Sequence, residues 1–282
     1  MNSTPKARVS GGPGGRSPGQ AWKAGRVTAI TELTQPAHLV TPLFMLATQL
    51  LLTYWLWQAL YRDVHASAGL TAGQATTYAL LGVLYMRFRQ VNRWPNGDAM
   101  QQLMLEGTIA YWFVRPVSPR RYYLIRAVGD LGYGALWAVA GYVACLAAGA
   151  IMAPKSATAA LAALVTMALG LVVLYYVQLL VDLSCFWSAV NDQTVTAAQF
   201  IVNLLAGAFA PVWFFPAWFQ RADAFLPFQA TLNVPLSLYV GRLPASATGR
   251  QVAVQAFWAA ALAAVSWWLW RRAAARVTVL GG

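Results

Sequence analysis

Charge is what the sequence has least of, and negative charge is the scarcest kind. Only 10% of its 282 residues are charged, and the Asp and Glu residues together number 8. A soluble domain of ordinary composition carries about 25% charged residues. The hydrophobic content is 59% and the mean hydropathy is +0.51. These values exclude an ordinary soluble domain and predict an all-α integral membrane protein, because a helix satisfies its own backbone inside lipid.

Residues that bind metals or carry out catalysis are also few. Cys145 and Cys185 lie in or beside apolar runs and are predicted to pack as small hydrophobic side chains. His38 and His65 have no Cys or carboxylate at ligand spacing. The sequence has no GxxxxGK[ST] phosphate loop, no GxSxG elbow and no HExxH pair. We therefore expect no catalytic residues, no metal site and no cofactor in this chain, which is predicted not to be an enzyme.

Long apolar runs dominate what is present, and six of them have the length of a bilayer-spanning helix, about 20 residues. The predicted spans are residues 39–60, 70–88, 122–152, 159–181, 199 to about 216, and 252–270. They define a six-helix transmembrane domain at residues 39–270. Before it we predict a disordered tail at residues 1–21 and an amphipathic interfacial helix at residues 22–38. After it, residues 271–282 form a predicted cytoplasmic tail.

The basic residues predict the orientation in the inner (plasma) membrane. The net charge of +12 does not indicate nucleic-acid binding, because Lys and Arg sort by membrane side and form no single stripe. They concentrate in the N-terminal tail, in the connection between the second and third spans and in the C-terminal tail. Both termini are therefore predicted to be cytoplasmic. The connection between the fourth and fifth spans has no Lys or Arg, and only the even number of spans places it in the cytoplasm.

Two connections differ from ordinary short loops. Residues 91–123 are polar and basic and contain a helical run at residues 99–113, which indicates a surface for a soluble partner. Asp98 and Glu106 fall roughly on one face of this run; they could pair as catalytic acids, but an exposed helix face is favoured. Residues 211–244, between the fifth and sixth spans, are aromatic and broken by proline. This pattern predicts short or re-entrant helices buried against the rest of the protein.

Polar side chains inside predicted spans are candidates for a translocation path, because such residues default to functional roles in membranes. The candidates are Gln49 and Thr53 in the first span, Gln178 in the fourth and Asn203 in the fifth. The alternative for each is an interhelical hydrogen bond that contributes about 0.6 kcal/mol.

Several motifs, in order along the chain, resemble ABC-2 type transporter permeases. The segment Leu105-Glu106-Gly107-Thr108, followed by Val114-Arg115-Pro116-Val117-Ser118-Pro119, is similar to the family's "G…LLRPVSP" segment, with Val114 where Leu is expected. The Phe186-Trp187 pair, the Phe214-Phe215-Pro216 run and the Leu226-Pro227-Phe228 stretch with Pro235 and Gly241 match further family features. The resemblance covers nearly the whole chain from Trp22 and is to the six-span branch.

The resemblance implies a permease subunit of an exporter. Two permeases, identical or sister chains, would form the translocation path along their first, second and fifth spans. A separate ABC ATPase would bind ATP and Mg and dock on a cytosolic coupling helix at residues 98–105. The residues implied in coupling are Asp98, Met100, Gln101, Leu103, Met104, Glu106 and Arg115.

Two other functions stay open at this point. A secondary, gradient-driven transporter predicts ionisable residues in mid-membrane and usually an internal repeat, and neither is clear in the sequence. A membrane-embedded enzyme acting on lipids predicts a His/Asp/Glu cluster, for which the sequence has few residues. The sequence does not define the transported substrate.

Overall fold

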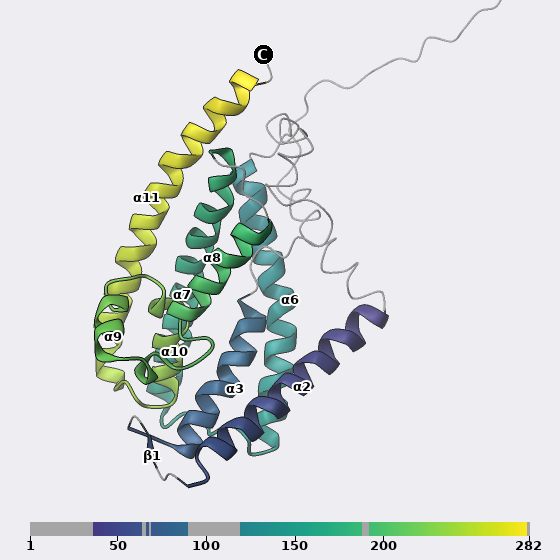
Figure 1. Ribbon diagram of the computed structural model, residues 1–282, viewed down its shortest axis with the longest axis vertical. Coiled ribbons are helices and arrows are strands. Elements are labelled where there is room, and N and C mark those ends of the chain that lie inside the picture. Colours follow the sequence, from purple (N-terminus) through teal and green to yellow (C-terminus); the bar gives the residue numbers. More distant parts are fainter. Residues whose placement is uncertain (1–35, 64–65, 68, 90–118, 188–191, 281–282) are drawn as a thin grey trace, which may run out of the picture.

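The computed structural model describes residues 36–63, 66–67, 69–89, 119–187 and 192–280, and this part of the chain is almost entirely helical (Figure 1). The predicted amphipathic helix and the coupling segment lie outside the described residues, apart from residues 36–38. The α-helices are α2 (Pro36–Leu60), α3 (Ala72–Phe88), α6 (Pro119–Ala147), α7 (Ala157–Leu183), α8 (Asp192–Leu205), α9 (Ala217–Asp223), α10 (Asn233–Tyr239) and α11 (Thr248–Leu280). Four short 3₁₀ helices accompany them: η1 (Ser184–Phe186), η2 (Val212–Phe214), η3 (Gln229–Thr231) and η4 (Ala245–Ala247).

Four helices are long and apolar enough to cross a bilayer. They cover Val40–Leu60, Tyr123–Ala147, Ala157–Leu183 and Ala245–Ala273, which correspond to the predicted first, third, fourth and sixth spans. The last of these helices, α11, continues through the predicted C-terminal tail as far as Leu280.

The predicted second and fifth spans are shorter than expected. Helix α3 has 17 residues and begins at Ala72, because Leu70 and Thr71 form strand β2. Helix α8 ends at Leu205 and does not reach residue 216. It ends there because Gly207, with φ of +80°, turns the chain and the amides of Gly207 and Ala208 bond back to the carbonyls of Leu204 and Asn203.

A small hairpin is the exception to the predicted all-α fold among the described residues. Strands β1 (Ala66–Ser67) and β2 pair antiparallel, with Ala66 opposite Thr71. Thr71 is also the N-cap of α3: its hydroxyl accepts from the Gln74 amide, and the Gln74 side chain accepts from the Thr71 amide. This capping box fixes where α3 begins. We call this end of the bundle, which also holds the α6–α7 connection, the hairpin end (Figure 1).

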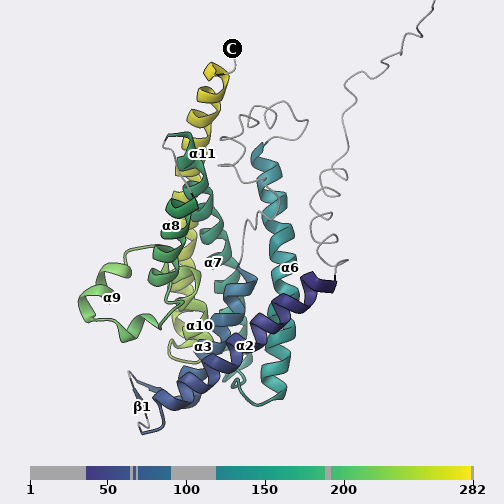
Figure 2. The same cartoon turned by 45° about the vertical axis from the view of Figure 1, so that its right-hand side comes forward.

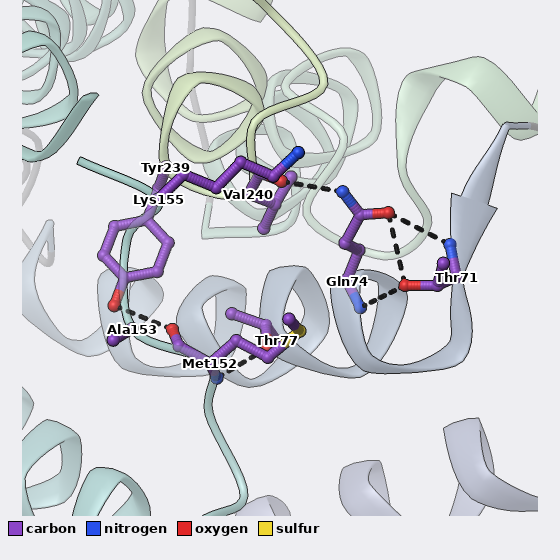
Figure 3. Close-up of a pocket in the computed structure, with 8 residues that line it drawn as sticks. All are labelled: Thr71, Gln74, Thr77, Met152, Ala153, Lys155, Tyr239 and Val240. Carbon is purple, nitrogen blue, oxygen red and sulfur yellow. Dashed lines mark hydrogen bonds between the residues drawn. The ribbon is translucent and has the colours of Figure 1, made fainter.

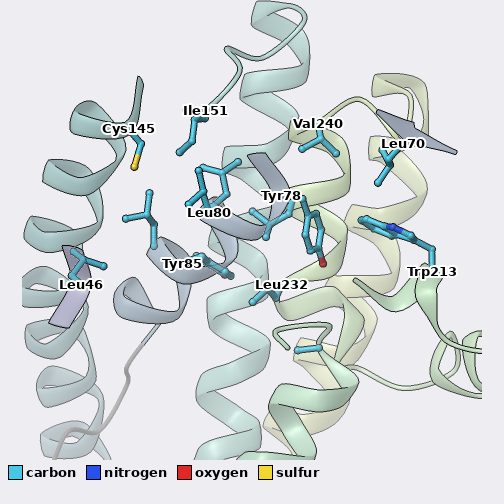
Figure 4. Close-up of a cluster of buried hydrophobic side chains, with 14 of the residues drawn as sticks. Leu46, Leu70, Tyr78, Leu80, Tyr85, Cys145, Ile151, Trp213, Leu232 and Val240 are labelled. Atoms are coloured by element: carbon cyan, nitrogen blue, oxygen red, sulfur yellow. The ribbon is translucent and has the colours of Figure 1, made fainter. Parts of the chain in front are cut away.

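Helix α3 forms the centre of the bundle, packed against α2 and α6. The main hydrophobic cluster surrounds it and draws side chains from α2, α6, α7 and the α8–α11 connection, including Leu46, Tyr78, Cys145 and Leu232 (Figure 4). Cys145 is therefore a buried member of the core and a free thiol, in agreement with the sequence.

The segment between α8 and α11 folds back into the bundle. The η3 turn and helix α10 pack on α7, and Figures 1 and 2 show the connection lying beside α7 and α11. The turn approaches Gly170, the middle residue of α7, so closely that a methyl group there would lie 2.7 Å from the Ala230 carbonyl oxygen. The short helices predicted here are present, and their turn reaches half-way along α7.

Helix α3 likewise ends beside the middle of α6. A methyl group on Gly134 would lie 2.6 Å from the Arg87 carbonyl oxygen and 2.9 Å from that of Phe88. Nothing lies within 4 Å of the corresponding point on Gly132, in the same helix. The two glycines therefore differ in packing although they share a helix.

We expect Gly134→Ala to lower the free energy of unfolding by about 1–3 kcal/mol, because the backbone of α3 must shift to make room. Gly132→Ala is the matched control and should be neutral or stabilising by about 0.5–1 kcal/mol. Thermal unfolding of both variants in detergent measures this difference. Equal midpoints for the two would contradict the close packing of α3 on α6.

Candidate functional site: a buried polar junction

Three interruptions of regular helix meet in the middle of the bundle: the end of α3, the end of α8 and the η3 turn. Each contributes a polar side chain, namely Arg89, Asn203 and Thr231. We call these three residues, with Tyr78 and Asn233 beside them, the polar junction. It links segments that are far apart in the sequence, since Arg89 and Thr231 are separated by 142 positions.

Arg89 is the charged member of the polar junction and is 5% exposed. Its Nη1 donates to the Thr231 hydroxyl at 3.2 Å, and its Nη2 donates to the Asn203 side-chain oxygen. Its backbone amide caps α3 by donating to the Tyr85 carbonyl at 2.8 Å. No carboxylate in the described part of the chain forms an ion pair with it. The guanidinium is instead held by neutral acceptors.

The position of Arg89 suits a cation for a second reason. It follows the last residue of α3, and its partner Asn203 lies in the last turn of α8. The carboxyl ends of helices carry unpaired carbonyls and a partial negative charge. Two such ends therefore help to offset the desolvation of the buried guanidinium.

Tyr78 and Asn233 extend the polar junction from α3 to α10. The Tyr78 hydroxyl donates to the Asn233 side-chain oxygen at 3.0 Å, and the Asn233 amide donates to Gln229 at 3.3 Å. The Tyr78 ring also meets Trp213 edge-on, with centroids 4.7 Å apart. These contacts fix the start of α10 against the body of α3.

Gln255 of α11 secures the turn from the other side. Its side-chain nitrogen donates to the carbonyls of Thr166 and Ala230, at 2.9 and 2.8 Å. The side chain is fully buried, so these bonds form in a dry environment. Gln255 thereby supplies the irregular backbone of η3 with a hydrogen-bond donor, in place of the backbone amide that would serve in a regular helix.

The structure brings only one of the four translocation-path candidates into the polar junction. Asn203 lies there, whereas Gln178 belongs to a separate cluster in which it donates to Asp182 at 3.3 Å. Asp182 also accepts from the Tyr123 hydroxyl, so this cluster joins α6 to α7. Gln49 is exposed on α2 and Thr53 is half-buried there. The predicted coupling residues, from Asp98 to Arg115, lie outside the described residues.

The sequence predicted Arg89 as part of the basic connection between the second and third spans and gave no sign of its burial. Arg87 and Arg89 directly follow an apolar run and look like the basic border of a membrane span. Arg89 is buried instead, because α3 ends beside the middle of α6. Thr231, Asn233 and Gln255 were also missed. The signal available for the first two was their polarity within the otherwise apolar residues 230–238.

Among the residues whose burial the structure describes, one carboxyl group outside the long helices is buried. Asp223, at the end of α9, is 1% exposed and neither of its oxygens has a hydrogen-bond partner within the described residues. Burial raises its pKa to about 6, and the nearby Gln229 side chain offsets part of this shift without reaching hydrogen-bond geometry. No group of three or more His, Cys, Asp or Glu that could hold a metal occurs in the described part of the chain.

Membrane-length helices arranged around a buried polar junction define a multi-pass α-helical membrane protein. The chain belongs to the ABC-2 family transporter proteins, a family of membrane transport components, whose family model matches residues 44–281. The match covers every element described above except the first turns of α2. No curated protein and no solved structure matches the chain significantly.

We expect Asn203→Leu to destabilise the protein by about 1.5–3 kcal/mol, because it removes an acceptor from a buried cation. The exposed Gln199, one turn earlier on α8, provides the control Gln199→Leu, which should change stability by less than about 0.5 kcal/mol. Thermal unfolding in detergent gives both values. In the double variant Arg89→Met/Asn203→Leu the loss of stability should be smaller than the sum of the losses in the two single variants, since no unpaired buried charge remains. A simple sum would show that the two side chains are not coupled.

We expect Asp223→Asn to stabilise the protein at pH 7 and to remove a pH dependence. The folded-state pKa of about 6 exceeds the ordinary value of 3.8, so the wild type gains stability as the pH falls from about 6 toward 4 and the folded protein takes up a proton. Unfolding midpoints at pH 7 and pH 5 measure this gain. The exposed Asp63 gives the control Asp63→Asn, which should keep the gain in stability. If Asp223→Asn also keeps the gain between pH 7 and pH 5, the pH dependence belongs to another group.

Proposed function

We propose that this chain is the membrane-spanning permease subunit of an ATP-driven ABC-2 type exporter. The observation that carries the proposal is the family match over residues 44–281, which includes the segment resembling a coupling helix. ABC-2 permeases generally work with a separate ATPase subunit, and this sequence has no phosphate loop of its own. ATP and Mg would therefore be bound by the partner.

We assign six membrane crossings, with both termini in the cytoplasm and the hairpin end outside. The crossings are α2, α3, α6, α7, α8 with the turn that follows it, and α11. The distribution of basic residues supports this orientation: of 20 Lys and Arg, those at the hairpin end and in the α8–α11 connection are Arg62, Lys155, Arg221, Arg242 and Arg250. The burial of Arg89 removes one residue from the cytoplasmic side without changing the balance.

The translocation path would lie between two permease chains, identical or sister, along α2, α3 and α8. Helix α2 supports this arrangement because most of its length is exposed, with only 11% of its most apolar stretch buried in the monomer. Helix α8 packs mainly on α7 and leaves Phe200 and Ile201 exposed. Gln49 on α2 and Asn203 on α8 would then be the polar candidates nearest the path.

The polar junction suits a movable joint within such a path. Arg89 connects the end of α3 to the end of α8 and to η3 through side-chain hydrogen bonds, which can exchange partners more readily than a packed apolar contact. ATP-driven closure of the partner must favour one packing over another. A shift from 1:99 to 99:1 requires about 5.5 kcal/mol of differential binding, which a few exchanged contacts of this type supply.

A secondary transporter is the second candidate, and Arg89 is the observation that favours it, because such proteins use ionisable residues in mid-membrane. An arginine side chain keeps its charge in proteins, so Arg89 cannot take up and release the protons of a gradient. Its partners are neutral and offer no carboxylate for a coupling cation. The ATP-driven mechanism therefore fits the polar junction better.

The test is whether an ATPase co-purifies with the permease through residues 98–106. We expect an ATPase subunit, at about one per permease, in a mild-detergent preparation from the native membrane. Replacing Met100, Leu103 and Met104 together by Asp should remove it, because the apolar face of the coupling helix would no longer fill a groove on the partner.

The matched control is Met100→Leu with Met104→Leu, which keeps the face apolar and should retain the ATPase. Unfolding midpoints establish that the Asp variant is still folded. A preparation free of ATPase, together with flux driven by a gradient that the Asp variant does not alter, would reject the exporter and favour the secondary transporter.

A further inference from the structure

A groove opens between α6 and α7, away from the polar junction. These helices follow each other in the chain but have few contacts along this stretch, because α6 packs on α3 whereas α7 packs on α10 and α11. The groove has a volume of about 410 Å³, within the range of small-molecule sites. Residues lining it include Leu84, Ala135, Ala138, Ala160, Met167 and Leu236.

Small residues keep the groove open. The walls present Ala135 and Ala138 from α6 and Ala160 from α7, where larger side chains would fill the space. At its mouth Val139 and Leu164 are 60% and 62% exposed, so the groove opens sideways out of the bundle. Because α6 and α7 are membrane-length helices, this mouth faces lipid acyl chains.

A polar pocket lies beside the groove at the hairpin end. The pocket has a volume of about 270 Å³ and shares Tyr239 with the groove (Figure 3). The Tyr239 hydroxyl donates to the Met152 carbonyl at 3.1 Å and lies 2.8 Å from the Tyr142 hydroxyl. Residue 154 lines the groove while residues 153 and 155 line the pocket, so the two spaces are direct neighbours.

Lys155 gives the pocket its charge. Its side chain is exposed and lines the pocket, and no carboxylate in the described residues pairs with it. Its stem lies against Gly241, where a methyl group would come within 3.0 Å of Cδ and Cε. Other polar groups of the pocket are already paired: the Thr71 hydroxyl donates to Gln74, which in turn donates to the Val240 carbonyl at 3.0 Å. The ammonium group is thus the donor available to a ligand.

We propose that the groove and the pocket together bind one anionic phospholipid of the surrounding bilayer. One acyl chain would lie between α6 and α7, and the headgroup phosphate would lie on Lys155. The groove extends over about seven residues of α6, or about 10 Å, which is less than the ~15 Å depth of one hydrocarbon leaflet. An apolar groove beside an unpaired cation matches an anionic amphiphile in both parts of its structure.

Titration of the full-length chain in detergent with palmitoyl-oleoyl phosphatidylglycerol or phosphatidylcholine, read by native mass spectrometry, tests the headgroup. We expect the anionic lipid to bind about fivefold more tightly, the factor for one basic side chain near an anionic surface. Lys155→Gln should abolish this preference, whereas Arg250→Gln, an exposed cation at the start of α11, should preserve it. Equal affinity of the two lipids for the wild type, or equal effects of the two variants, would overturn the proposal.

Groove filling tests the acyl chain. Ala138→Phe should weaken both lipids at least about fivefold, whereas Ala140→Phe, on the exposed face of the same helix, should weaken neither. If Ala138→Phe fails to fold, photolabelling of the wild type tests the groove instead. A phosphatidylglycerol with a diazirine in its acyl chain should label residues 135–142 and 160–167 more strongly than the exposed faces of α2 and α11. Uniform labelling would show that the groove holds only bulk lipid. Loss of a dimer in Ala138→Phe with no change in lipid binding would show that a second copy of the chain occupies the groove.

Discussion

Backbone that leaves regular helix inside an apolar bundle must find hydrogen-bond partners within the protein, and this demand shapes the whole molecule. The η3 turn reaches the middle of α7 because Gly170 offers no side chain there. Gln255 then donates to the buried carbonyl of Ala230, and Thr231 accepts from Arg89. Helices α3, α7 and α11 are thus positioned by one short turn as well as by their own apolar faces.

The positions of the four long helices could be predicted from the sequence, because length and hydropathy alone determine whether a segment can cross a bilayer. The same criterion misjudged the helix bounds of the other two predicted spans. Within the apolar runs of residues 70–88 and 199–216, α3 begins only after a strand and α8 ends at a glycine turn. Hydropathy measures burial in any apolar environment and does not distinguish lipid from the interior of a protein.

The polar junction shows the same limit at the level of single residues. Asn203 was predicted as a functional candidate because it is polar within an apolar run. Arg89 was not, because a charge at the end of an apolar run normally marks the membrane border. Only the depth at which α3 ends separates the two cases, and α3 ends there in close contact with Gly134 on a different helix. Contacts between distant segments carry this information, and a single sequence does not contain it in readable form.

The long sequence separations within the polar junction have a consequence for how the protein is made. Arg89 leaves the ribosome 114 residues before Asn203 and 142 residues before Thr231. During that interval the nascent α3 carries a cation for which its final acceptors do not yet exist, and an arginine without partners is costly in the bilayer centre. The hydrogen bonds that hold Arg89 can therefore form only after the η3 turn has been synthesised, and the bond from Gln255 to this turn only after α11 has followed.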